Sequence, residues 1–323
     1  MKLFQKYFLI LITIGLFFSC KEEDKNEKAI NAIAMDVELI RFDRLFADAT
    51  SEDIPELKAS YPYLFPKQYS DSVWIAKLTD TLQIELEEEV NKVFRSFEDE
   101  SEDIESLFKH FKYYFPRFYP PKVITVISDV NYNDRVILAD SLLLLGLDNY
   151  LGEEHYFYSG LPNYVAKGLD KDYLTSNIAS ALAKRVNKYP RNRSFLSRMV
   201  YYGKELYLID RLIPNTEDYQ KIGYTKEELD WARINEEQIW RHFIEEELLY
   251  STDAKLDRRF LDPAPFSKFG LELDSESPGR LGRYMGWQIV RAFMDKNPNI
   301  SPTQLLSLPA DDIFKKSNYK PKR

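Results

Sequence analysis

Histidines are the residues that could most readily hold a metal in this chain, and there are three of them: His110, His155 and His242. None belongs to an H-E-x-x-H pattern, which places two imidazoles one helical turn apart on a zinc ion. His242 precedes Glu245 and Glu246 by three and four residues on a predicted helix, a spacing that could hold a metal. The same spacing is typical of a solvated helix face with an ion pair, which we expect here. For His155, which lies among aromatic residues, we expect a structural role.

A second group of oxygen-bearing side chains occupies the first, third, fifth and twelfth positions of a calcium-loop pattern: Asp129, Asn131, Asn133 and Asp140. The sixth position of such a loop is a glycine, because the chain turns sharply there. Here it is Asp134, and predicted strands, not helices, flank the segment. Since Asn and Asp also form hairpin turns without an ion, we expect a turn and no metal.

Motifs for covalent or phosphate chemistry are missing from the sequence, which has neither a G-x-S-x-G elbow nor a P-loop. Gly282 and Gly286, one helical turn apart, would instead let another element pack closely on their helix. A small-molecule or glycan site near Pro278-Gly279-Arg280 would leave no recognisable signature. We therefore assign no catalytic residue, metal or cofactor, and whether the chain is an enzyme stays open, with a non-catalytic role expected.

The only cysteine, Cys20, follows a short basic segment and an apolar run from Tyr7 to Phe18. That run is too short to span a bilayer, which needs roughly 20 apolar residues, but it has the length of a signal-peptide core. A small residue followed by Cys at this place resembles a lipobox, in which the thiol is acylated and becomes the new N-terminus. Phe17 stands where a typical lipobox has Leu, a looser form like the lipoprotein signals of Bacteroidetes. We therefore predict a lipoprotein signal peptide over 1–19 and lipidation at Cys20; an ordinary signal peptide or short anchor is the alternative.

The composition after the signal is acidic and apolar enough for a packed core. The formal net charge is −8, and removal of Lys2 and Lys6 with the signal makes the balance more acidic. This balance argues against nucleic acid as a partner. The charged residues from Cys20 to 33 predict an acidic tether; Lys21-Glu22-Glu23 also resembles a surface-export tag. We expect a membrane partner through the lipid anchor alone, in the inner or outer membrane, with the domain in the periplasm or on the cell surface.

Apolar periodicity predicts helices in the N-terminal half, and β-branched runs predict strands in the middle. Helices are expected to begin at Ser51-Glu52-Asp53-Ile54, to cover 72–97 as one or two segments, and to cover 103–114. A strand followed by a short helix is expected over 37–46, and strands over 122–127, 135–139 and 141–147. Together these strands predict a small antiparallel or mixed sheet.

After residue 168 the pattern returns to helices, expected over 172–189, 192–213, 225–250, 282–296 and 302–306. The long one begins with Thr225-Lys226-Glu227-Glu228, a capping-box pattern. The fold class is therefore α+β and mostly helical, with a single globular domain over 34–323.

Several long stretches resemble the gliding-motility lipoprotein B (GldB) family of Bacteroidetes. They are LLLLGLDNYLG at 142–152, VYYGKELYLIDRLIP at 200–214, HFIEEELLYSTD at 242–253, SPGRLGRYMGWQIVRAFM at 277–294 and SNYKP at 317–321. The resemblance implies a cell-envelope component required for gliding, in bacteria whose gliding machinery is linked to type IX secretion. It implies protein partners in that machinery and no established catalytic activity.

A weaker resemblance, to zincin-like peptidases, implies a degenerate zincin-like fold. The helix that should carry H-E-x-x-H reads Asn177-Ile178-Ala179-Ser180-Ala181, without a histidine, and Glu205 is the remaining candidate for a third ligand. Zinc catalysis needs three protein ligands and a bound water. Two functions follow from these patterns: a non-catalytic gliding lipoprotein, which we favour, and a lipid-anchored peptidase or glycan-acting hydrolase.

Overall fold

The computed structural model describes residues 25–271 and 274–321, so Cys20, the signal over 1–19 and the first part of the expected tether lie outside the described residues. The chain divides into an N-terminal unit, 1–34, and a main unit, 35–323. In the N-terminal unit the helix α2 (Lys25–Asn31) occupies most of the described part of the segment expected as a tether. None of the described helices is long and apolar enough to cross a membrane.

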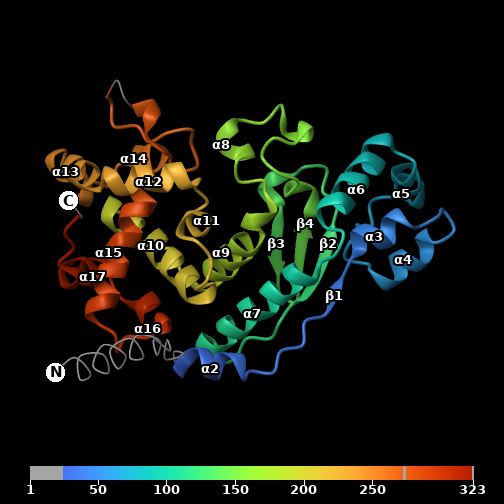
Figure 1. Ribbon diagram of the computed structural model, residues 1–323, viewed down its shortest axis with the longest axis horizontal. Helices are drawn as coiled ribbons and strands as arrows, with labels where there is room; N and C mark the ends of the chain where they lie inside the picture. The colour runs from blue at the N-terminus through green and yellow to red at the C-terminus, as the bar shows by residue number, and fades with distance from the viewer. Residues whose placement is uncertain (1–24, 272–273, 322–323) are drawn as a thin grey trace, which may run out of the picture. The chain divides into compact units, whose positions relative to one another are not determined.

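A four-stranded mixed sheet forms one part of the main unit (Figure 1). Its order is β1 (Leu39–Ile40), β2 (Lys122–Val126), β4 (Leu142–Gly146) and β3 (Val136–Ala139). β2 runs parallel to both β1 and β4, while β3 and β4 form an antiparallel hairpin. The α+β class is confirmed, and of the two expected sheet types the mixed one is present.

Alternation along the strands gives the sheet two apolar faces. Ile124 on β2 packs with Phe42 and Phe46 of α3 (Phe42–Ala47) and with Ile54 of α4 (Ile54–Ser60). Its neighbour Val123 faces the larger core, which contains apolar residues of α6 (Thr81–Val93), α7 (Glu98–Tyr114), α9 (Leu174–Val186) and the C-terminal helices. The segment expected as one or two helices over 72–97 is two, α5 (Asp71–Leu78) and α6.

Two long helices, α10 (Phe195–Leu212) and α15 (Leu281–Lys296), form the centre of the helical part. They cross where both lack a side chain: a Cβ on Gly286 would lie 1.9 Å from the carbonyl oxygen of Met199, and one on Gly203 would lie 2.2 Å from that of Gly286. The close approach expected at Gly286 is therefore confirmed. At Gly282 a Cβ would lie 2.9 Å from the carbonyl oxygen of Phe260, so that position is also tight, though less so than the crossing.

The remaining shorter helices are α8 (Asn163–Ala166), α11 (Asp218–Ile222), α12 (Lys226–Ile234), α13 (Glu236–Glu245), α14 (Lys255–Phe260), α16 (Pro302–Ser307) and α17 (Ala310–Ser317). The capping box at Thr225 and Glu228 is present and begins α12. The single long helix expected over 225–250 is wrong, because the chain leaves helical geometry at Asn235 and starts again as α13. The amide of Asn235 donates to the carbonyl of Trp231, a side-chain bond that competes with helix continuation.

The helix expected to begin at Ser51-Glu52-Asp53-Ile54 is present as α4 (Ile54–Ser60), without a side-chain cap. Asp53 stands at the N-cap of α4, but its side chain makes no capping bond. Its carboxylate instead accepts hydrogen bonds from the backbone N–H and the hydroxyl of Thr50, which lie before the helix. The acidic residue therefore closes the preceding turn.

Candidate functional site

His242 does not lie on a solvated helix face, so the role we expected for it is wrong. Its ring packs against Phe269 and Phe260, with centroids 5.0 and 6.2 Å away, and its Nε2 is buried without a hydrogen-bond partner. Burial lowers the pKa of this imidazole, since an apolar environment disfavours the charged form. The helix face that carries His242 is therefore part of an aromatic cluster. Phe260 and Phe269 follow α13 in the chain, so this cluster forms only when the later segments pack on α13.

His155 has the local bonds of a structural residue. Its Nε2 lies 3.3 Å from a carboxylate oxygen of Glu89, its Nδ1 accepts from the N–H of Phe157, and its ring stacks on Tyr156 with centroids 4.5 Å apart. These contacts join the loop after the sheet to α6. Among the described residues, no three His, Cys, Asp or Glu side chains come together in a group that could hold a metal.

The calcium-like segment is a turn whose side chains bond to other protein groups. Asp129 pairs with Lys77 at 2.9 Å, the Asn131 amide donates to Asp134, and Asp140 lies 3.3 Å from Arg185. The ligands expected of a calcium loop thus point to separate partners.

Asp148, which sequence reasoning missed, holds the start of this turn in place through hydrogen bonds to its carboxylate. Its fully buried carboxylate accepts from the N–H and hydroxyl of Ser128 at 2.9 Å and from the N–H of Val130 at 2.6 Å. Burial raises the pKa of Asp148, and these bonds oppose the shift. Nothing in the sequence distinguishes Asp148 from the many exposed carboxylates.

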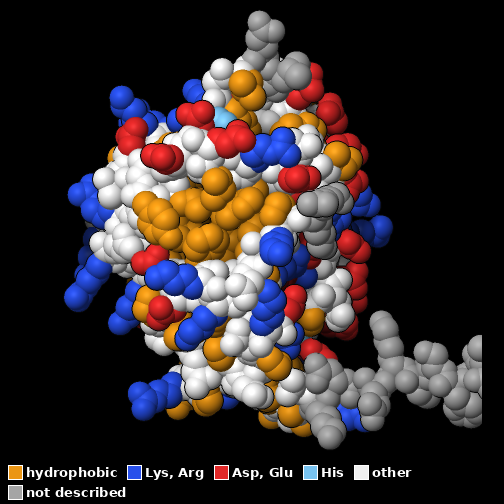
Figure 2. All heavy atoms as spheres, turned by 90° about the vertical axis from the view of Figure 1, so that its left-hand side faces the viewer, with side chains coloured by type: hydrophobic (Ala, Val, Ile, Leu, Met, Phe, Trp, Pro, Cys, Tyr) orange, Lys and Arg blue, Asp and Glu red, His pale blue; other side chains and the backbone are white. Residues whose placement is uncertain are grey.

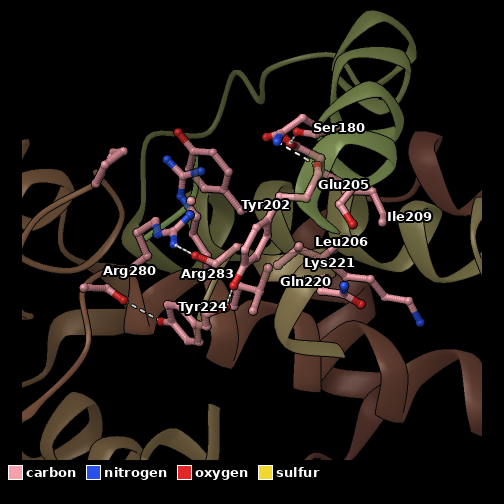
Figure 3. A pocket seen from close by; sticks show the side chains of 18 of the residues that line it. Ser180, Tyr202, Glu205, Leu206, Ile209, Gln220, Lys221, Tyr224, Arg280 and Arg283 are labelled. Carbon is pink, nitrogen blue, oxygen red and sulfur yellow. Dashed lines mark hydrogen bonds between the residues drawn. The ribbon is translucent and has the colours of Figure 1, made fainter. Parts of the chain in front are cut away.

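A cavity of about 510 Å³ is the clearest candidate site in the described part of the main unit. It lies where α9 and α10 meet the start of β3, the segment from α11 to Tyr224, and the turn that leads into α15 (Figure 3). The volume is within the range of roughly 300–1,000 Å³ usual for small-molecule sites. Arg280, near which the sequence left room for an unmarked site, lines this cavity.

One end of the cavity carries its acidic side chain. Glu205 of α10 is only 5% exposed, and one of its carboxylate oxygens accepts a hydrogen bond of 2.8 Å from Ser180 of α9. The ammonium of Lys184 lies 3.9 Å from the same oxygen, while the other oxygen, Oε2, is buried without a hydrogen-bond partner. Glu205 therefore faces the helix that the zincin resemblance singled out, but that helix offers Asn177 and Ser180 in place of histidines.

Three arginines line the cavity and bond only to uncharged acceptors, and two of them, Arg280 and Arg283, lie across from Ser180 and Glu205 (Figure 3). Arg280 donates to the carbonyl of Gly223 at 2.6 Å, Arg283 donates to the carbonyl of Leu261, and Arg135 donates to the side-chain oxygen of Asn177 at 3.1 Å. Among the described residues none of the three has an ion pair. No sequence signal links them, because Arg135 directly precedes β3 while Arg280 and Arg283 lie at the start of α15, far away in the chain.

Backbone geometry fixes the turn that carries Arg280. This residue has a left-handed conformation, with φ of 61°, directly before α15, and Gly223 opposite it has φ of 70°. A Cβ on Gly279 would lie 2.3 Å from the carbonyl oxygen of Ala264, so only glycine fits there. The hydroxyl of Tyr224 donates to the carbonyl of Gly279, and the guanidinium of Arg280 lies 5.3 Å from the Tyr224 ring centroid. These contacts hold the guanidinium at the cavity wall.

Comparison with known proteins gave one family. The family model described as gliding motility protein GldB matches residues 23–321, nearly the whole chain. No protein of curated function and no solved structure matched, so the zincin resemblance gains no support from a solved fold. The match includes every segment that lines the cavity and all the stretches quoted from the sequence. The chain belongs to the GldB family of gliding motility proteins.

Proposed function

We propose that this protein is a lipid-anchored component of the cell envelope that supports gliding by contact with other proteins of the gliding and type IX secretion machinery, and that it is not an enzyme. Family membership makes it a gliding-motility-related lipoprotein, and this observation carries the proposal. The signal pattern before Cys20 supports acylation of that thiol. Two or three acyl chains would give stable anchoring, which a single chain does not.

An exposed apolar surface supports the proposed contact with other proteins. Figure 2 shows apolar side chains gathered into a patch on the side of the main unit where α13 and α17 lie in Figure 1. Large contiguous patches of this kind mark protein or membrane contact sites. Trp240 of α13 packs against Phe314 of α17 and Tyr319, with centroids 5.8 and 5.3 Å apart, so α13 is joined to the C-terminal segment.

The residues of the cavity support a non-catalytic role. General acid–base hydrolysis of glycosides uses two carboxyl groups, and a catalytic zinc needs three protein ligands. Among its described lining residues the cavity offers one carboxylate, Glu205, and no histidine. An envelope hydrolase remains the second candidate because Glu205 is buried at a cavity wall with an oxygen free of protein hydrogen bonds.

Gene deletion in the natural host, followed by rescue, tests both candidates. We expect the deletion to abolish single-cell movement on glass and colony spreading, and the wild-type gene to restore both. Glu205→Gln keeps the shape of the side chain and removes its charge, so a non-catalytic protein should still restore movement. Normal gliding of the deletion strain would overturn the proposed role, and failure of a stably produced Glu205→Gln protein would favour the hydrolase.

A further inference from the structure

The arginines of the cavity are arranged to receive an anion. Of its described lining residues six are basic and one is acidic, although the whole chain has a net charge of −8. Lys167 pairs with Glu228, and Lys221 lies 3.4 Å from Asp210, so these two charges are balanced by the protein. Arg135, Arg280 and Arg283 are partly buried and bond only to neutral oxygens. A partly buried guanidinium without a carboxylate partner is costly, and an anionic ligand would offset that cost.

At the end of the cavity that carries Glu205, the ligand must present a hydrogen-bond donor and not an anion. The Oε2 atom of Glu205 is buried and lacks a donor, so a ligand that reaches it must provide a hydroxyl or an ammonium. Lys184 already lies 3.9 Å from this carboxylate, which disfavours a second positive charge nearby. Hydroxyl groups, which can donate to Glu205 and to the hydroxyl oxygen of Ser180, fit this end best.

The walls between the two ends are aromatic. Five tyrosines line the cavity: Tyr132, Tyr164, Tyr173, Tyr202 and Tyr224. Arg283 stacks on Tyr202, with its guanidinium carbon 3.9 Å from the ring centroid, and this contact holds both side chains in place. Tyrosine presents an apolar face with a polar tip, a surface suited to the C–H faces and hydroxyls of a sugar ring.

We propose that this cavity binds a small polyhydroxylated carboxylic acid of the acidic-sugar class, with the carboxylate at Arg280 and Arg283 and the hydroxyls at Glu205 and Ser180. The planar guanidinium is the side chain best matched to a carboxylate, because it can donate two parallel hydrogen bonds. Inorganic phosphate matches the arginines equally well but brings no hydroxyl-rich ring to Glu205 and the tyrosines. This inference is independent of the gliding role.

Calorimetric titration of the full-length protein in detergent tests the ligand class. The probes are digalacturonate and diglucuronate, the neutral disaccharides of galactose and glucose, and inorganic phosphate. We expect at least one acidic disaccharide to bind about tenfold or more tightly than its neutral counterpart, since hydrogen bonds to a charged group are the stronger ones. Equal binding of acidic and neutral sugars, or no binding of either acid, would overturn the proposal. Phosphate binding as tight as that of the acids would assign the arginines to a phosphate-bearing ligand and overturn the sugar assignment.

Charge-removing variants locate the binding. Arg283→Gln should lower affinity for the acid about tenfold or more and leave that for the neutral sugar unchanged. Arg241→Gln is the matched control, because Arg241 is exposed on α13 and pairs only with Glu237 in the described structure. Should Arg283→Gln lower the melting temperature strongly, Arg280→Gln provides the same test at the other arginine assigned to the carboxylate. Unchanged affinity in a folded arginine variant would contradict the assignment.

Discussion

The charged side chains between α10, α11 and α15 pair with one another, whereas the three arginines that line the neighbouring cavity have no carboxylate partner among the described residues. Arg291 of α15 donates to Asp210 at 2.6 Å and to Asp218 at 2.8 Å, and Asp210 also accepts from the indole N–H of Trp287. Arg280, the residue directly before α15, has only a carbonyl acceptor. Side chains on or next to α10 and α15 therefore form both a network of paired charges and a cavity whose arginines lack carboxylate partners.

The pKa values of Arg291 and Arg280 shift in opposite directions, because only Arg291 has carboxylate partners. Burial alone would lower the pKa of Arg291, but hydrogen bonds to Asp218 and Asp210 outweigh burial and raise it. Burial lowers the pKa of Arg280, and no carboxylate bonds to it to reverse the effect. Both guanidinium groups stay charged at any ordinary pH, so the difference is one of free energy. Paired charges stabilise a fold, while an unpaired charge at a cavity marks a place for a ligand.

The largest loss of stability is expected at the helix crossing on which both regions depend. Gly286→Ala should reduce the free energy of unfolding by about 3 kcal/mol, at the upper end of overpacking costs, because the new Cβ would meet the backbone of Met199. Urea unfolding measures the change. Gly160→Ala is the control, because a Cβ there would meet nothing within 4 Å, and it should be nearly neutral. Equal stability of the two variants would show that α10 and α15 cross less closely than described.

Removal of the central cation should break the balanced network. Arg291→Gln removes the guanidinium that bridges Asp210 and Asp218, which then share only the ammonium of Lys221 at 3.4 and 3.6 Å. It should cost about 2–4 kcal/mol, somewhat less than a fully buried pair because the arginine side chain is 26% exposed. Arg280→Gln should cost less in urea unfolding, since it breaks no ion pair. A larger loss for Arg280→Gln would reverse the contrast between the two regions.

Two buried carboxylates sharpen the contrast further. Asp148→Asn should cost about 2 kcal/mol, because an amide cannot accept all the N–H and O–H bonds that this carboxylate receives. Glu205→Gln should change stability by less than about 1 kcal/mol, since it keeps the bond with Ser180 and removes a poorly paired charge. Thermal and urea unfolding of both variants measure the difference. A Glu205→Gln protein as unstable as Asp148→Asn would show that Glu205 is a structural residue.

The smallest expected effect is a pH dependence at Lys204 of α10. Its ammonium donates to the carbonyls of Leu306 and Leu308, and burial lowers its pKa to about 8. Because the unfolded pKa of lysine is about 10.4, the unfolded chain binds the proton more tightly, and this contribution to stability appears only as the pH rises through 8. Relative to Lys204→Met, the wild-type protein should gain about 1 kcal/mol between pH 7.5 and 9. A constant difference across that range would show that Lys204 titrates normally.

The sequence predicted the elements whose signals are local. The β-branched run at Val123–Val126 is a strand, and Thr225 with Glu228 caps a helix, because both signals act within a few residues. The break at Asn235 was missed, since an apolar stripe continues through it.

The cavity could not be predicted, because it depends on long-range packing. Arg135 and Arg283 meet only after the sheet and α15 have been placed, and Glu205 was singled out for a zinc ligand role that no histidine supports. The burial of Asp148 and of His242 likewise depends on distant segments. Local patterns thus gave the fold class, and tertiary contacts determine which charges are paired.

Rescue of the deletion strain with Cys20→Ala tests the central claim, a gliding component that acts from a lipid anchor, most directly. Single-cell speed on glass is the measurement, with immunoblotting of membrane and soluble fractions to show that the variant is produced. The account predicts that wild type restores movement and that Cys20→Ala, released from the membrane, does not. Full movement with a soluble Cys20→Ala protein would contradict the need for the anchor.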